Sequence, residues 1–268
     1  MKITYASVTA GRRPFLEKLA AVAAAGFAGI SVSIFDYRAA RSEGHSDADI
    51  VAAARGCGVE IASVGGATRW LNGTADEDEV LTMALAERFG SRMINCSPSN
   101  GVYSGPESAA AAFAAVCDRA ALRGFSCRLE FIPWTGVRDL ATGLDVVRRA
   151  GRPNGGLLID NWHLQRSGGT LAELRAIPPE CIFGVQLSDD TLEWTQQDPK
   201  TRIPQRLLPG EGELDVAGFV AVLEQIGASA GYEAEPINRR WDEMPASVGL
   251  PLVYDATARV VATAKQTG

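Results

Sequence analysis

Short runs of apolar and β-branched residues alternate along the chain with longer stretches rich in alanine, leucine, arginine and glutamate. The short runs are typical of buried parallel strands, and the longer stretches are typical of the helices that cover such a sheet. The predicted strands are Ile3–Val8, Ile30–Ile34, Val59–Val64, Met93–Cys96, Cys127–Ile132, Gly156–Asp160, Ile182–Leu187 and Gly231–Pro236. The predicted helices are Pro14–Ala25, Asp47–Cys57, Asp76–Phe89, Pro106–Leu122, Leu140–Ala150, Leu171–Ile177, Val216–Ile226 and Tyr254–Lys265.

Eight strands, each followed by a helix, predict an α/β protein with a parallel sheet and right-handed crossovers. Eight such units in 268 residues fit a closed (β/α)₈ TIM barrel better than an open, doubly wound sheet. We therefore predict one barrel domain over residues 1–268. The catalytic groups of such a barrel lie at the C-terminal ends of its strands.

Composition limits the classes of partner. The net charge of −6 lacks the basic excess that a nucleic-acid or anionic membrane surface needs, and no stretch reaches the roughly 20 apolar residues of a membrane span. The apolar run Leu19–Ile30 reads as part of an amphipathic first helix rather than a signal peptide. The five cysteines are scattered and form no CxxC pair, which predicts buried, reduced thiols in a cytoplasmic protein.

Four oxygen donors lie in the last four predicted strands. They are Glu130, Asp160, Gln186 and Glu235. A carboxylate among apolar strand residues is costly unless it is paired, and a hard divalent cation would pair all four groups. Three carboxylates and one amide favour Mn²⁺ or Mg²⁺, with Co²⁺ or Zn²⁺ also compatible. The alternative is that barrel arginines pair with these side chains. Glu233 would face the same side of its strand as Glu235, and spacing alone does not choose between them.

Four further residues are candidates for binding a substrate. His163 follows Asp160 by three residues, Arg69 and Trp134 follow the third and fifth strands, and Glu211 lies in a Leu-Pro-Gly-Glu-Gly-Glu-Leu-Asp motif. The alternatives are a structural hydrogen bond for His163, a surface ion pair for Arg69, rim packing for Trp134 and a turn cap for Glu211. Tyr5, Phe35 and Asn95 could also line the pocket.

Two loops complete the expected barrel mouth. His45, in a loop after the second strand, is either solvated or part of a lid. The long irregular stretch Asp190–Leu208 follows the seventh strand, on the face where barrel active sites form.

Taken together, these motifs resemble the xylose isomerase-like TIM barrel superfamily of sugar isomerases and epimerases, and most closely its hydroxypyruvate-isomerase-like members. The resemblance rests on Asp160–Gln165, Val185–Asp189, Pro209–Glu213 and Glu235. It implies that Glu130 and Glu235 bind the metal and relay protons, that Asp160 and Gln186 complete the ligand set, and that His163 contacts substrate. It also favours Glu235 over Glu233. The chain departs from many epimerases by carrying Gln186 where they have histidine. It departs from the ketose 3-epimerases by carrying Gly136 in place of their second glutamate.

The expected activity is metal-assisted isomerisation or epimerisation of a small polyhydroxy-carbonyl compound, by proton transfer next to the carbonyl. A keto-sugar, an inosose and a hydroxypyruvate-like compound are the candidate substrates. Two alternatives stay open: a metal-dependent dehydratase of the 3-dehydroshikimate or inosose type, and a barrel that binds a sugar or a partner without catalysis. The apurinic endonucleases share the fold but need a histidine cluster that two histidines cannot build. A homo-oligomer is compatible with the sequence.

Overall fold

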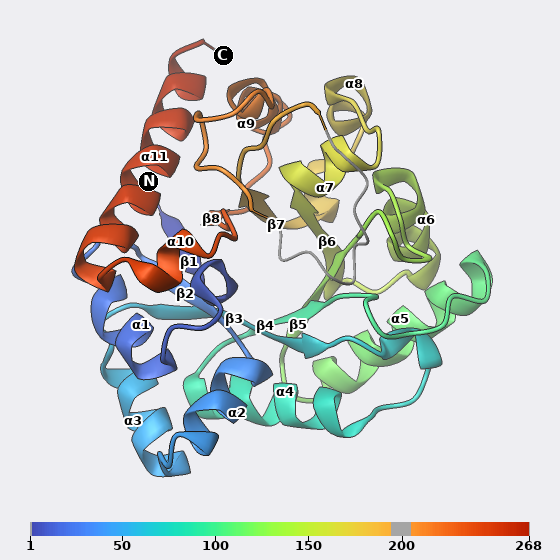
Figure 1. Cartoon of the computed structure of the whole chain (residues 1–268). Coiled ribbons are helices and arrows are strands. Elements are labelled where there is room, and N and C mark those ends of the chain that lie inside the picture. The colour runs from blue at the N-terminus through green and yellow to red at the C-terminus, as the bar shows by residue number, and fades with distance from the viewer. Residues whose placement is uncertain (1, 194–204, 268) are drawn as a thin grey trace.

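The eight predicted strands close into a parallel barrel in which each strand pairs with the next and the last pairs with the first. The computed structural model describes residues 2–193 and 205–267. Figure 1 shows the barrel at the centre of a ring of helices. The strands are β1 Ile3–Ala6, β2 Gly29–Ser33, β3 Glu60–Ala67, β4 Met93–Cys96, β5 Ser126–Glu130, β6 Gly155–Asp160, β7 Ile182–Leu187 and β8 Tyr232–Ala234. The predicted (β/α)₈ fold is confirmed.

Helices surround the barrel and bury its outer face. They are α1 Phe15–Val22, α2 Ile34–Ser42, α3 Asp47–Gly56, α4 Glu77–Phe89, α5 Pro106–Ala121, α6 Leu140–Ala150, α7 Asn161–Arg166, α8 Leu171–Arg175, α9 Val216–Gln225, α10 Arg240–Glu243 and α11 Ala246–Thr267. The last helix, α11, packs against α9 and α1 and closes the ring (Figure 1). No helix in the described part of the chain is both long and apolar enough to cross a membrane.

The structure corrects the prediction around the first two strands. Strand β1 ends at Ala6, because residues Ser7–Ala10 form a 3₁₀ helix. Strand β2 ends at Ser33, because Ser33 and Asp36 form a capping box that starts α2, a helix the pattern did not predict. His45 therefore follows α2 instead of β2, and it is absent from the residues lining the cavity at the barrel mouth.

Side chains on the outer faces of the strands fill the space under the helices. Tyr5 is fully buried there, with its ring 5.2 Å from the ring of Phe27, so it packs in the core and does not line the cavity at the mouth. All five cysteines are free, and four are buried, as predicted for small apolar side chains. The inner face differs at its C-terminal end, where charged groups replace apolar ones.

Candidate active site

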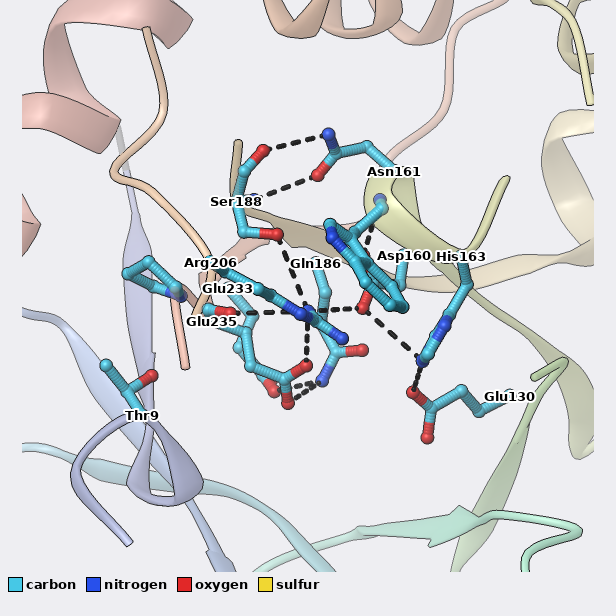
Figure 2. A network of polar contacts seen from close by, with 12 residues as sticks. Thr9, Glu130, Asp160, Asn161, His163, Gln186, Ser188, Arg206, Glu233 and Glu235 are labelled. Carbon is cyan, nitrogen blue, oxygen red and sulfur yellow. Dashed lines mark hydrogen bonds and ion pairs between the residues drawn. The ribbon is translucent and has the colours of Figure 1, made fainter. Parts of the chain in front are cut away.

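The four predicted oxygen donors come together at the C-terminal end of the barrel. Glu130 is the last residue of β5, Asp160 is the last residue of β6, Gln186 lies in β7, and Glu235 directly follows β8. Parallel neighbours in a barrel bring strand ends of this kind to one rim. A cavity of about 250 Å³ opens there and reaches Glu130, Gln186 and Glu235. Figure 2 shows the side chains converging on one centre.

His163 joins the two carboxylates at the ends of β5 and β6. It lies on the first turn of α7, which Asp160 caps: the Asp160 side chain accepts a hydrogen bond from the Trp162 backbone N–H. This turn places His163 Nε2 3.2 Å from Glu130 Oε1 and 3.7 Å from Asp160 Oδ2. The ligand atoms of the three residues lie within 4.8 Å of one another, so this group can hold a metal ion.

Arg206 is the main residue of the site that sequence reasoning missed. It is 2% exposed, and its Nη1 lies 2.8 Å from Asp160 Oδ2 and 3.1 Å from Glu235 Oε2 (Figure 2). Its guanidinium also stacks on Trp162, with 4.5 Å between Cζ and the ring centroid. Arg206 therefore pairs with two of the four predicted ligands, as the alternative reading of these residues expected, but it does not pair with Glu130 or Gln186.

Trp134 lies at the edge of the same centre. Its ring is 44% exposed and contacts the rings of Trp162 and His163 edge to face, with centroid separations of 6.0 Å and 5.6 Å. These contacts pack the Trp134 ring against the ring of His163. Trp134 thus combines the expected rim packing with a position beside His163.

The Pro-Gly-Glu-Gly-Glu segment is held by a buried aspartate. Asp189 accepts hydrogen bonds from the backbone N–H groups of Gly210 and Leu214, at 2.9 Å and 3.0 Å. Gly212 passes so close that a Cβ there would lie 2.4 Å from Asp189 Oδ1. The motif therefore has a structural role: its backbone is bound to the Asp189 side chain, which fixes the segment between Arg206 and α9. Glu211 is exposed and pairs with Arg240 at 2.8 Å, outside the cavity lining.

A second polar layer lies deeper in the barrel. Gln186 Nε2 donates to Glu233 Oε1 at 2.8 Å and to Glu235 Oε1 at 2.9 Å. Glu233 in turn pairs with Arg128 at 2.7 Å. Arg128 and Glu233 were not predicted as a pair, because 105 residues separate them in the sequence. Glu233 and Glu235 do face the same side of β8, as their spacing predicted.

The remaining predicted residues fall into two groups. Phe35 and Asn95 line the cavity, as expected. Arg69 is exposed and does not line it. The Asp190–Leu208 stretch is described only at its two ends, where Asp189 and Leu207 pair as an antiparallel bridge; residues 194–204 lie outside the described part.

The centre carries more negative than positive charge. Four buried or half-buried carboxylates, Glu130, Asp160, Glu233 and Glu235, face two guanidinium groups, Arg128 and Arg206.

Burial, together with the neighbouring carboxylates, raises the pKa of Glu235 well above its usual value despite Arg206. The pKa of Asp160 is lowered, because the charges of Arg206 and His163 outweigh its burial. Gln186 Oε1 is buried and has no hydrogen-bond partner among the described residues. Four carboxyl groups around two guanidinium groups, together with an unpaired amide oxygen, fit a divalent cation, whose charge would favour the ionised form of Glu235.

We expect chelator-treated protein to lose stability as the pH rises above about 5. The folded-state pKa of Glu235 is raised, so between the pKa of the unfolded chain and that of the folded protein, the folded protein keeps a proton that the unfolded chain has released. Linkage then lowers the free energy of unfolding by at most about 1.4 kcal/mol per pH unit. Asp160 does not oppose this trend. The stability that its lowered pKa contributes is fully present above the pKa of aspartate in the unfolded chain, and it is lost only as the pH falls through the lowered pKa of the folded protein.

Urea titrations at four pH values in EDTA would measure this slope. The Glu235→Gln variant is the control, since it removes Glu235 and keeps every other group that titrates in the same range. Its profile should be flatter than that of the wild type. Parallel profiles for the two proteins would contradict the assignment of the raised pKa to Glu235.

Comparison with known proteins identifies the family. The model of a family described as xylose isomerase-like TIM barrel matches residues 19–252. A 3-dehydroshikimate dehydratase of Pseudomonas aeruginosa is 30% identical over 237 residues, which are 83% of this chain and 36% of that enzyme. An inosose isomerase of Halalkalibacterium halodurans is 26% identical over 145 residues, which are 52% of this chain and 49% of that enzyme. The match thus spans from about a third to a half of the length of these curated relatives.

Solved structures agree on the fold. The structure of an IolI protein with a bound zinc atom superposes with a TM-score of 0.83, at 19% identity and over 98% of both chains. The structure of an L-ribulose 3-epimerase superposes with a TM-score of 0.72, at 18% identity and over 100% of this chain and 97% of that one. These identities are low, so the two structures support the barrel architecture and do not indicate a shared substrate.

Proposed function

The chain belongs to the xylose isomerase-like TIM barrel family, and from this premise we propose that it is a divalent-metal-dependent enzyme that isomerises or epimerises a small polyhydroxy ketone. The observation that carries the proposal is the convergence of four oxygen donors on one centre. They are Glu130, Asp160, Gln186 and Glu235, and at this centre the carboxyl groups outnumber the arginines. Buried carboxylates in such excess are costly in an apolar barrel unless a cation accompanies them.

These four residues would hold the cation, with His163 next to Glu130 and Asp160. Oxygen-rich ligands favour Mn²⁺ or Mg²⁺, and Co²⁺ or Zn²⁺ also suits a site that includes a histidine. When bound, the cation would polarise the carbonyl and hydroxyl oxygens of the substrate and lower the pKa of the carbon between them. All other roles fall to the side chains of the chain itself.

The two glutamates suit the two proton transfers. Glu130 and Glu235 both line the cavity and come from strands β5 and β8. One would remove the proton next to the carbonyl, and the other would return a proton to the neighbouring carbon or to the opposite face. Arg206 holds Glu235 in place, because its Nη1 donates to Glu235 Oε2.

The cavity also indicates the class of substrate. At about 250 Å³ it lies below the usual range for drug-sized ligands, so a single small ring or open-chain sugar would fill it. Away from the carboxylates, its lining is rich in hydroxyl and amide groups, and no lysine or arginine occurs among its described lining residues. These groups suit an uncharged polyol. Six of them are Ser7, Ser33, Thr68, Asn95, Ser97 and Asn100.

One observation favours a second candidate, a dehydratase. The 3-dehydroshikimate dehydratase of Pseudomonas aeruginosa is similar over most of this chain. Dehydration begins with the same proton abstraction and ends with loss of a hydroxyl from the neighbouring carbon. A carboxylated substrate would need a cation of its own, and the guanidinium of Arg206 already pairs with Asp160 and Glu235. This pairing makes the uncharged substrate our first choice.

We expect the protein with Mn²⁺ to exchange the proton next to the carbonyl of an uncharged inosose or keto-sugar for deuterium in D₂O. NMR would follow exchange and product in parallel for inososes, keto-sugars, hydroxypyruvate and 3-dehydroshikimate, with EDTA-treated protein as control. Release of water from 3-dehydroshikimate, with no exchange into the uncharged compounds, would move the protein to the dehydratases. Equal exchange with and without EDTA would contradict a metal-dependent reaction, and no exchange into any of them would favour a barrel that only binds.

A further inference from the structure

The amide of Gln186 can adopt only one orientation at the centre of the barrel. Its nitrogen lies between Glu233 Oε1 and Glu235 Oε1, at 2.8 Å and 2.9 Å. An ionised carboxylate oxygen can only accept a hydrogen bond, so the group facing Glu233 must be the NH₂ group. The carbonyl oxygen Oε1 is thereby turned to the other side, where it is buried and has no hydrogen-bond partner in the described part of the chain.

Glu233 is the fixed member of this arrangement. Its Oε2 accepts hydrogen bonds from Arg128 Nη2 at 2.7 Å and from the hydroxyl of Ser31 (Figure 2 shows Glu233 beside Gln186). Glu233 is 2% exposed and Arg128 is 6% exposed, so water does not compete for this pair.

Arg128 is itself held by two further side chains. Its Nε donates to Asn95 Oδ1 at 2.5 Å, and its Nη2 donates to Ser63 Oγ at 2.9 Å. Gly184 makes room for the guanidinium, because a Cβ at that position would lie 2.4 Å from Arg128 Nη1. The position of Glu233 is therefore set by β5 and by its neighbours around the barrel.

We propose that Glu233, held by Arg128, is a positioning residue that orients the Gln186 amide so that Oε1 is the atom offered to the divalent cation. This inference rests on the proposed function. It assigns Glu233 no contact with the cation: its Oε2 pairs with Arg128 and its Oε1 accepts from Gln186. Without Glu233 the amide nitrogen keeps Glu235 Oε1 as its one remaining acceptor. The amide could then turn by 180° and present its NH₂ group, which cannot bind a cation. Partners that orient metal ligands in this way typically contribute 10- to 100-fold to metal affinity.

The test replaces the pair as a unit. The double variant Arg128→Met/Glu233→Leu removes one positive and one negative charge, so the net charge of the site is unchanged and only the orientation of Gln186 is released. We expect its affinity for Mn²⁺ alone, measured by isothermal titration calorimetry and by the EPR signal of free Mn²⁺, to fall 10- to 100-fold. The matched control is Arg119→Met/Glu79→Leu, which removes another ion pair with a buried carboxylate, between α5 and α4, and should leave Mn²⁺ affinity within about threefold of the wild type.

A rescue separates orientation from general damage. Adding Gln186→Glu to the double variant should restore Mn²⁺ affinity to within about threefold of the wild type or above it, because either oxygen of a carboxylate can bind the cation. If the double variant does not fold, Glu233→Asp keeps the charge beside Arg128 but withdraws it from Gln186, and its Mn²⁺ affinity should fall by a similar factor.

The outcomes distinguish the inference from the function on which it rests. A wild-type protein that binds no Mn²⁺ would overturn both. A wild-type protein that binds Mn²⁺, together with a folded double variant or Glu233→Asp variant of unchanged affinity, would overturn the positioning role alone. Failure of Gln186→Glu to restore binding would likewise assign the loss to structural damage and overturn it.

Discussion

Replacing Glu235 by glutamine is expected to lower kcat by roughly 10²- to 10⁴-fold, the range over which a positioned acid or base contributes to proton transfer. The change keeps the shape of the side chain and its place next to Arg206, but it removes the group that can take up or release a proton. The raised pKa of Glu235 brings it closer to the pH at which such transfers are efficient. Since the loss concerns the transition state, kcat and kcat/KM should fall together.

Two measurements would accompany the rate. Deuterium exchange next to the carbonyl should fall in parallel with turnover, and thermal unfolding with and without Mn²⁺ would show whether the variant is folded and still binds the metal. Glu107→Gln, an exposed residue of the first turn of α5, is the control and should keep wild-type rates. A folded, metal-binding Glu235→Gln protein with full activity would exclude Glu235 as the acid or base.

The sequence was most informative where a polar residue interrupts an apolar strand. Glu130, Asp160 and Gln186 each stand at or next to the end of such a run, and a parallel barrel brings strand ends to one rim without further information. The strand pattern therefore predicted both the fold and the convergence of the donors. The same pattern placed Glu235 and Glu233 on one side of β8, and the structure gives them different partners: Gln186 contacts both, but Arg128 pairs only with Glu233.

The arginines could not be found in the same way. Arg128 stands in a strand like many structural residues, and nothing local shows that it reaches Glu233 across the barrel. Arg206 lies near the end of the irregular sequence stretch Asp190–Leu208, which has no periodicity, so nothing local predicts its burial between Asp160 and Glu235. Helix α2, in contrast, carried a readable signal: Ser33 and Asp36 have the spacing of a capping box.

Replacing Arg206 by methionine is expected to lower the free energy of unfolding of the metal-free protein by about 3–5 kcal/mol at pH 8, as when one partner of a buried ion pair is removed. Asp160 is 1% exposed and would lose its nearest cation, while Glu235 would lose the charge that partly opposes its raised pKa. The loss should shrink at pH 5, where the two carboxyl groups are protonated more readily.

The same variant tests whether a cation belongs at this centre. If Mn²⁺ binds next to Asp160 and Glu235, it supplies the positive charge that methionine lacks. The difference in free energy of unfolding between variant and wild type, measured with urea, should then be smaller in saturating Mn²⁺ than in EDTA. Arg152→Met, which breaks an exposed pair with Asp118, is the control and should change the free energy of unfolding little under both conditions. An equal difference in free energy of unfolding with and without Mn²⁺ would mean that Arg206 and the metal do not share these carboxylates. The charge balance on which the proposed function rests would then have another explanation.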